Sequence, residues 1–220
     1  MPKHLKSKIN DLKRDEIIRV AGNLFYQNGF TKTSVDDIAS ALSVGKPFIY
    51  SFFPSKADLL AVVCNRVTSF AADLAVYALN EEGSFVDRLD RVVRQLCLRV
   101  IDGHLYLAVL FREEKHMPSV AVKQLSRNRH AFKNAVTKLL DDGKNAGEFQ
   151  FQASSAITEL AMTGMITWVF TWYQERGALK PEQIADQMTG LVMDMVKARL
   201  PVNQQARSAV GTSSQRHTKP

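Results

Sequence analysis

Cysteine is scarce in this sequence: only Cys64 and Cys97 occur in 220 residues, and neither belongs to a CxxC pair. A disulfide framework or a structural zinc site is therefore not expected. Both cysteines lie in apolar surroundings with helical spacing, where we expect them to be buried as small hydrophobic side chains.

Long apolar runs are also missing. The longest uncharged apolar stretch, residues 161–173, has 13 residues, whereas a membrane-spanning helix needs roughly 20. The lysine-containing N-terminal residues 1–10 are not followed by the apolar segment of a secretory signal. We therefore expect a cytoplasmic protein with no membrane contact.

Acidic residues are absent from the C-terminal segment 197–220, which has a net charge of +5. Residues 1–60 have a net charge of +3 and residues 61–196 a net charge of −1, so the overall charge of +7 lies at the two ends. This distribution suggests an N-terminal module that binds a polyanion, attached to a nearly neutral body.

Alternating strand patterns are missing as well, because apolar residues recur at spacings of three and four. The sequence therefore predicts an all-α fold. Hydroxyl and proline helix starts, and glycine and proline breakers, indicate nine helices and a disordered tail after residue 201. The nine predicted ranges are residues 11–28, 35–42, 46–53, 55–80, 84–102, 104–116, 118–145, 154–176 and 181–199.

The second and third predicted helices have the spacing of a helix-turn-helix, in which the second helix of the pair enters the major groove of DNA. The turn between them is Ser43-Val44-Gly45. The residues around this pair form the pattern Ala21-x-x-Leu24-Phe25-x-x-x-Gly29-Phe30-x-x-Thr33-Ser34-Val35-x-x-Ile38-Ala39, Val44-x-Lys46, Ile49-Tyr50, Phe53-Pro54-Ser55-Lys56 and Leu59-Leu60. This pattern covers about 50 residues and closely resembles the N-terminal DNA-binding domain of the TetR family of repressors.

This resemblance implies an all-helical homodimer, in which three N-terminal helices bind operator DNA and six further helices bind a ligand and dimerise. We divide the chain accordingly into a DNA-binding domain with a basic N-terminal arm (1–60), a ligand-binding and dimerisation domain (61–200) and a disordered basic tail (201–220). The number of helices predicted from periodicity agrees with this plan.

The sequence departs from the family pattern at two places. Ser43 stands in the turn where the family usually has glycine, and Gly45 stands where it commonly has serine, so a local rearrangement of the turn is one possibility. Pro47-Phe48 replaces the small Gly-Thr pair, which favours an apolar contact, for instance with a thymine methyl group. The operator sequence of other family members is therefore not transferable.

The candidate DNA contacts are eight residues on or beside the helix-turn-helix. We expect Lys46, Phe48, Tyr50 and Ser51 in the groove, with Pro47 fixing the helix start, and Tyr50 and Lys56 on phosphate. Thr33 is expected to cap the second helix. A core position for Tyr50 and a solvated charge for Lys56 are the alternatives. The eight candidates are Thr33, Ser34, Lys46, Pro47, Phe48, Tyr50, Ser51 and Lys56.

Two further groups in this domain have an expected place. Phe52, Phe53 or both should pack into the small core of the domain. A basic arm could follow the DNA backbone into an adjacent groove, although such runs are more often simply solvated. The arm consists of Lys3, Lys6, Lys8, Lys13 and Arg14.

The last two predicted helices are strongly apolar, and the family pairs them with those of a second subunit in a four-helix bundle. Gly164 and Gly190 would allow close approach there. An intramolecular core stripe predicts the same pattern. We favour dimerisation, because one module reads only one half-site whereas a two-fold pair reads a palindrome.

The effector is the least defined part. The pattern from Phe132 to Gly177 resembles, more loosely, family members that sense fatty-acyl or other CoA thioesters. The segment 123–138 has five basic residues and no acidic one, so it either holds CoA phosphates or is a solvated helix face. The pocket candidates, any of which could equally be core, are Leu98, Leu105, Val109, Phe132, Met165, Trp168 and Trp172.

The pattern does not favour an enzyme. The five histidines show no HxxxH or HExxH spacing, and neither a P-loop nor GxGxxG occurs. Glu113-Glu114-x-His116 could ligate a metal, but such a cluster is more often a polar helix end. No cofactor or metal is expected, and a structural helical protein without a DNA role is the third alternative.

Overall fold

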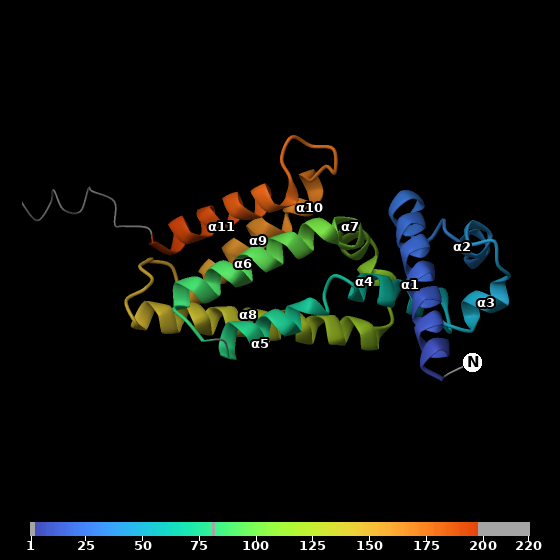
Figure 1. Ribbon diagram of the computed structural model, residues 1–220, viewed down its shortest axis with the longest axis horizontal. Coiled ribbons are helices and arrows are strands. Elements are labelled where there is room, and N and C mark those ends of the chain that lie inside the picture. Colours follow the sequence, from blue (N-terminus) through green and yellow to red (C-terminus); the bar gives the residue numbers. More distant parts are fainter. Residues whose placement is uncertain (1–2, 81, 198–220) are drawn as a thin grey trace, which may run out of the picture.

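The computed structural model describes residues 3–80 and 82–197, and the regular secondary structure of these residues is entirely helical (Figure 1). The all-α prediction is confirmed. The helices are α1 (Lys3–Asn28), α2 (Val35–Ala41), α3 (Lys46–Tyr50), α4 (Lys56–Asn65), α5 (Phe70–Asn80), α6 (Phe85–Asp102), α7 (His104–Glu113), the 3₁₀ turn η1 (Glu114–His116), α8 (Ser119–Asn145), α9 (Ser155–Thr167), α10 (Val169–Trp172) and α11 (Pro181–Lys197).

The molecule is elongated, and its first helices form one end (Figure 1). Helix α1 crosses the long axis, with α2 and α3 on its outer side, and α4 leads back into the larger part. There α5 packs along α8 and α6 along α11, while α9 contacts α8 and α6. The predicted tail 201–220 and the end of the last predicted helix lie outside the described residues.

Helix α2 begins where the sequence indicated, but its cap is a different residue. Ser34 Oγ accepts a hydrogen bond from the Asp37 amide at 3.1 Å, and the Ser34 amide donates to Asp37 Oδ2 at 2.7 Å. These two bonds form a capping box. The Ser34 amide and the Ser34 hydroxyl both donate to the Asp37 carboxylate, which lowers the pKa of this carboxyl. The prediction that Thr33 caps this helix is wrong, because Thr33 is buried and its hydroxyl donates to the Gly29 and Leu24 carbonyls at 2.8 and 3.2 Å.

The turn before α3 keeps a conformation that usually requires glycine. Ser43 has a φ of 55°, in the left-handed region, while Gly45 is the extended N-cap of α3. Pro47 lies in the first turn of α3, where its missing amide costs no hydrogen bond. The serine therefore adopts a strained backbone conformation, and residues 42–45 join the two helices.

Three predicted helices have different bounds. Helix α1 begins at Lys3, eight residues earlier than predicted, so the described part of the basic arm is helical. The predicted fourth helix is divided into α4 and α5, because the amides of Arg66, Val67 and Thr68 donate to carbonyls three residues back, which tightens the chain. The predicted eighth helix is divided into α9 and α10 and ends at Tyr173, which is extended.

Composition alone would let the segment Lys56–Asn80 span a membrane, since its mean hydropathy is 1.5. The turn at residues 66–69 divides this segment, and its halves pack against α1, α7, α6 and α8. Cys64 and Cys97 are buried and free, as predicted, and burial raises the pKa of their thiols to about 12 and about 11. These thiols are therefore neutral and unreactive at neutral pH.

Candidate DNA-binding surface and effector cavity

Helix α3 presents a small exposed surface at the end of the molecule. Lys46, Pro47, Tyr50 and Ser51 are exposed, and Tyr50, at 46% exposure, is not the core residue that the alternative proposed. Lys46 Nζ pairs with Asp36 Oδ2 of α2 at 2.8 Å, which raises the pKa of the Lys46 ammonium. A donor that pairs on the surface remains available to another anion.

The aromatic residues of this region have different burial. Phe53 is in the core, as expected, and Phe52 is half-buried. Phe48 is also half-buried, with its ring 5.2 Å from the Phe52 ring. Lys13 and Arg14 of α1 lie over the Phe48 and Phe53 rings at 5.8 and 5.2 Å, so this part of the basic arm packs on the domain and is not an extended arm.

Lys56 is an anchor inside the domain. Its ammonium donates to the Phe30 carbonyl at 2.9 Å and to the Thr33 carbonyl at 2.7 Å, and it lies 4.2 Å from the centre of the Phe30 ring. The bonds join the start of α4 to the α1–α2 loop. Lys56 is therefore not the freely solvated charge of the alternative interpretation, and its ammonium keeps one of three protons for a further acceptor.

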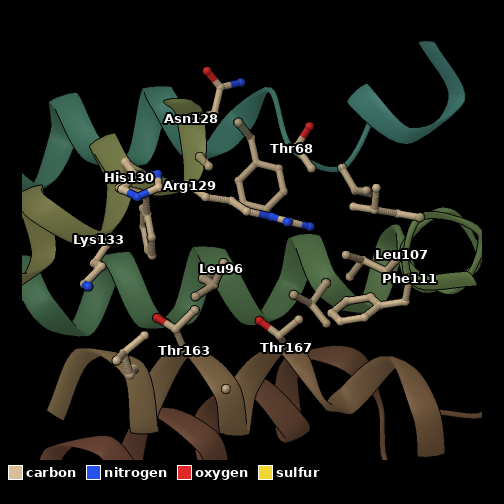
Figure 2. A pocket seen from close by; sticks show the side chains of 18 of the residues that line it. Thr68, Leu96, Leu107, Phe111, Asn128, Arg129, His130, Lys133, Thr163 and Thr167 are labelled. Carbon is tan, nitrogen blue, oxygen red and sulfur yellow. The ribbon is translucent and has the colours of Figure 1, made fainter. Parts of the chain in front are cut away.

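A cavity of about 480 Å³ lies in the larger part of the molecule, between α5, α6, α8 and α9. Its size is that of a site for a drug-sized ligand. Figure 2 shows Arg129 of α8 extending across this space, with Thr163 and Thr167 of α9 on the opposite wall. The lining is otherwise mainly apolar and consists of Val67, Phe70, Ala71, Leu96, Val100, Leu107, Leu110, Phe111, Phe132, Leu160 and Gly164, with Thr68, Glu114, Asn128, His130, Lys133 and Glu159 as further polar members.

Of the seven pocket candidates from the sequence, only Phe132 lines this cavity. Val109 is core, Leu105 and Met165 pack against the core, and Leu98 lines a different cavity beside His104. Trp168 and Trp172 are 60% and 48% exposed, so their assignment to the pocket is wrong. The sequence analysis placed the pocket along this helix, and α9 does line the cavity, but neither tryptophan is among the lining residues.

The basic segment of α8 is divided between cavity and solvent. Arg129 and Lys133 line the cavity, and Arg129 lies 3.5 Å from the Glu114 carboxylate on the adjacent wall. Lys123 and Arg127 are exposed, and Lys138 pairs with Asp142 at 2.8 Å. Only Arg129 and Lys133 are therefore placed where they could hold a phosphate in the cavity, whereas Lys123 and Arg127 belong to a solvated helix face.

Glu159 is a polar cavity residue that the sequence analysis did not identify. Glu159 is 2% exposed, and burial raises the pKa of its carboxyl. Thr163, one turn later, donates a hydrogen bond to Oε1 at 3.0 Å, whereas Oε2 is buried without a partner. The available signal was that Glu159, Thr163 and Thr167 follow each other at spacings of four and so form a polar stripe on an apolar helix.

Residues 111–116, at the end of α7 and in η1, lie between the cavity and α1. Phe111 and Glu114 line the cavity. Arg112 Nη2 donates to the Phe25 carbonyl and, at 2.9 Å, to the Tyr26 carbonyl at the end of α1. His116 stacks on Phe30 with ring centroids 4.9 Å apart. Different residues of this segment thus touch the cavity and the N-terminal part of the chain around α1.

Glu113 completes these contacts. It is buried, accepts a hydrogen bond from Arg112 Nε at 2.8 Å, and lies beside Gly29, whose φ is 83°. His116 is 3.8 Å from it, but within residues 3–80 and 82–197 no three potential metal ligands come together. Glu113 and Glu114 lie at the end of α7 and the start of η1, and the Glu113 carboxylate fixes the Arg112 guanidinium.

An apolar face of α9 and its neighbours is exposed. Ile157, Leu160, Gly164 and Trp168 follow each other at spacings of three and four, so they share one side of α9. Gly164 and Gly190 have open space where a Cβ would lie. Phe111, Trp172 and Leu191 are further exposed hydrophobic side chains on α7, α10 and α11. Patches of this kind usually mark interaction sites.

Comparison with known proteins assigns both parts of this architecture. Residues 17–63 match the bacterial regulatory proteins of the tetR family, and residues 82–196 match the tetracyclin repressor-like C-terminal domain. The HTH-type transcriptional repressor KstR2 of Rhodococcus jostii is 25% identical over 189 residues, which cover 83% of this chain and 90% of that protein.

Two solved structures illustrate the shared fold. The TetR family regulator PfmR from Thermus thermophilus has a TM-score of 0.73 and 21% identity, covering 80% of this chain and 96% of its own. AibR, described in complex with isovaleryl coenzyme A and operator DNA, has a TM-score of 0.66 and 21% identity, covering 81% and 96%. With an N-terminal helix-turn-helix and a helical C-terminal domain that both match, the chain belongs to the TetR family of transcriptional regulators.

Proposed function

We propose that this regulator is a cytoplasmic, homodimeric repressor, which leaves a palindromic operator when a small, largely apolar effector enters the cavity between α5, α6, α8 and α9. The observation that carries the proposal is the segment 111–116, in which Phe111 and Glu114 line the cavity while Arg112 holds the end of α1. We keep the division at about residue 60 between the operator-reading and effector domains.

On the operator, α3 enters the major groove. Lys46, Tyr50 and Ser51 are the exposed candidates for base or phosphate contacts, and Lys46 exchanges Asp36 for DNA. Ser34 and the third proton of Lys56 add phosphate contacts, whereas buried Thr33 positions the loop. Phe48, half-buried, offers its edge to a base, so Phe48→Ala alters sequence preference more than salt dependence.

The dimer forms through the exposed apolar face of α9 together with α11. Leu160, Trp168 and Leu191 are half or more exposed in the single chain, and burying them against a second copy removes apolar surface from water. A two-fold pair places two α3 helices about 34 to 36 Å apart or a multiple of this, as a palindrome requires.

The effector has an apolar body, and an acyl-CoA thioester is one candidate. Arg129 and Lys133 supply positive charge at the α8 wall, where phosphate or another anion could bind, and an acyl group would lie among the apolar side chains. The fold likeness to AibR, described with isovaleryl coenzyme A, favours testing this class. An uncharged apolar compound is the alternative, since most of the lining is apolar.

Release follows from differential binding. An effector lowers operator affinity only if it binds better to the arrangement that does not fit DNA, typically by about 1–3 kcal/mol. Two connections transmit this preference. Val67 and Thr68 in the turn between α4 and α5 line the cavity, and residues 111–116 join it to α1. Movement of either changes the separation of the two α3 helices.

The test is a titration of operator-bound protein. Free CoA, short- and long-chain acyl-CoA and uncharged apolar compounds are added, and operator release is followed by anisotropy of labelled DNA. We expect release by an apolar class, and loss of release with retained operator affinity in Arg112→Met. Arg129→Ala removes a charge from the α8 wall and so tests the acyl-CoA candidate. Lys123→Ala, exposed on the same helix, is its matched control. Absence of specific binding to duplex DNA, or a release that Arg112→Met leaves unchanged, contradicts the proposal.

A further inference from the structure

The inner wall of the cavity holds one polar group that the protein leaves incomplete. Glu159 is 2% exposed and lines the cavity, and its Oε2 has no hydrogen-bond partner, whereas Oε1 accepts from Thr163 at 3.0 Å. A buried carboxyl oxygen without a donor costs free energy, and native proteins retain few such groups. A ligand that supplies the missing partner recovers this cost on binding.

We propose that Glu159 is a specificity-determining residue of the cavity, which selects apolar effectors carrying a hydroxyl group that bonds to Oε2. This inference rests on the effector cavity of the proposed function and specifies the chemistry that the cavity accepts. Arg129 and Lys133 lie on the α8 wall of the cavity, whereas Glu159 and Thr163 form a polar pair on the α9 wall.

The choice of a hydroxyl follows from what each group offers. A hydroxyl donates to an ionised carboxylate and accepts from a protonated carboxyl, so it fits Glu159 in both states. A ketone or an ether only accepts, and it therefore fits the protonated state alone. An ammonium group would require a buried ion pair, whose desolvation is costly, and a carboxylate or phosphate would be repelled.

The surroundings of Glu159 support a site for a mostly neutral ligand. Burial is the main cause that raises the pKa of its carboxyl, and Lys133 on α8 opposes this effect. The other ionisable groups lining the cavity are Glu114, Arg129 and His130, of which Glu114 and Arg129 lie 3.5 Å apart. Leu96 and Phe132, which are both buried, add apolar lining, so a ligand hydroxyl near Glu159 has little competition from bulk water.

The experiment compares two probes that differ only at the hydroxyl. Binding of 4-hexylphenol and 4-hexylanisole to the full chain without DNA is measured by isothermal titration calorimetry. The variants are Glu159→Gln, which keeps the shape and one acceptor, and Glu159→Leu, which removes both oxygens. Glu182→Gln, exposed on α11, is the matched control. Thermal unfolding by circular dichroism verifies that each variant folds.

For the wild type and Glu182→Gln we expect the phenol to bind about tenfold or more tightly than the anisole. The ratio should fall in Glu159→Gln and approach one in Glu159→Leu. Equal affinities in the wild type, a ratio that persists in Glu159→Leu, or no binding of either probe overturns the assignment.

A parallel operator-release assay separates this inference from the proposed function. If both probes bind equally and both release the operator, the Glu159 assignment fails while the effector cavity stands. If the phenol is preferred through Glu159 but the operator stays bound, the assignment stands and ligand-induced release fails.

Discussion

Lys56 and Glu159 are ionisable residues that have been withdrawn from water in different ways. The Lys56 ammonium meets two backbone carbonyls and the face of Phe30, so its charge is compensated. The Glu159 carboxyl meets one hydroxyl and otherwise lies in an apolar wall. The contacts of Lys56 therefore hold two elements together, whereas burial of Glu159 raises the pKa of its carboxyl and favours the neutral form.

Glu159→Gln should stabilise the ligand-free protein at neutral pH. Burial raises the carboxyl pKa in the folded state, so the native state binds its proton more tightly than the unfolded state does. Folding stability contributed by this group is fully present below the unfolded pKa and is lost as pH rises through the folded pKa. Melting temperatures should therefore differ at pH 7 and converge below about pH 4.5.

The comparison uses thermal unfolding across this pH range, with Glu182→Gln as the exposed reference. A melting temperature of Glu159→Gln that is lower than that of the wild type at pH 7 would show that the carboxylate is compensated after all.

Lys56→Ala should destabilise the protein by about 1–2 kcal/mol, since hydrogen bonds to a charged donor are lost and two carbonyls lose a partner. Lys46→Ala should change stability less than Lys56→Ala does, because its ion pair with Asp36 is exposed. Urea unfolding of both variants measures the difference. In operator titrations, Lys46→Ala should reduce the salt slope by about one per subunit.

If Lys56→Ala has the urea unfolding curve of the wild type but its operator binding depends less on salt, the lysine acts on phosphate and its contacts with the loop are secondary. An unchanged salt slope in Lys46→Ala would remove that residue from the DNA contacts.

At the scale of the elements, the turn of the helix-turn-helix keeps a strained residue. Ser43 has a φ of 55°, and a side chain in this region costs roughly 1 kcal/mol relative to glycine. Ser43→Gly should therefore raise the free energy of unfolding by up to about 1 kcal/mol, whereas Ser40→Gly inside α2 should lower it. Urea unfolding tests both, and a destabilised Ser43→Gly would indicate that the serine side chain holds the turn.

The sequence is a good guide to elements with a marked boundary and a poor one elsewhere. Pro47 and Gly103 mark the starts of α3 and α7, and both were located closely. The break between α4 and α5 has neither glycine nor proline, because it arises from backbone bonds that shift by one residue at Arg66–Thr68. No single residue type in the sequence indicates such a shift.

The candidate site shows the same division. Spacing identifies which residues share one side of a helix, but not which neighbour that side meets. Tyr50 and Lys46 are exposed on α3, as a DNA contact would require, because the motif fixes the orientation of this helix. Trp168 was assigned to the cavity wrongly, because it shares one side of α9 with Leu160 and Gly164, which line the cavity, and only tertiary packing determines where along this side the cavity ends.

At the scale of the whole molecule, the tryptophans should report assembly. Trp168 and Trp172 are exposed in the single chain, so their emission should shift to shorter wavelength when a second copy covers them. Trp168→Asp combined with Leu160→Asp should produce a monomer with lowered operator affinity, because a charge would be buried in an apolar contact.

Sedimentation velocity at micromolar concentration measures the oligomeric state, and Val120→Asp, exposed on α8, is the control that should remain dimeric. A wild-type monomer at that concentration, or a dimer that survives the double substitution, would argue strongly against assembly through α9.

The connection between α1 and residues 111–116 also makes the molecule modular. Arg112 binds main-chain carbonyls of Phe25 and Tyr26, which every sequence possesses. Two side-chain conditions stand out beside it: a ring at Phe30 for stacking on His116, and no Cβ at Gly22, where it would lie 2.7 Å from the Tyr106 ring. We therefore expect that a helix-turn-helix from another regulator that meets these conditions can be grafted here, and that such a chimera would serve as a sensor in reporter circuits if the cavity binds the proposed effector.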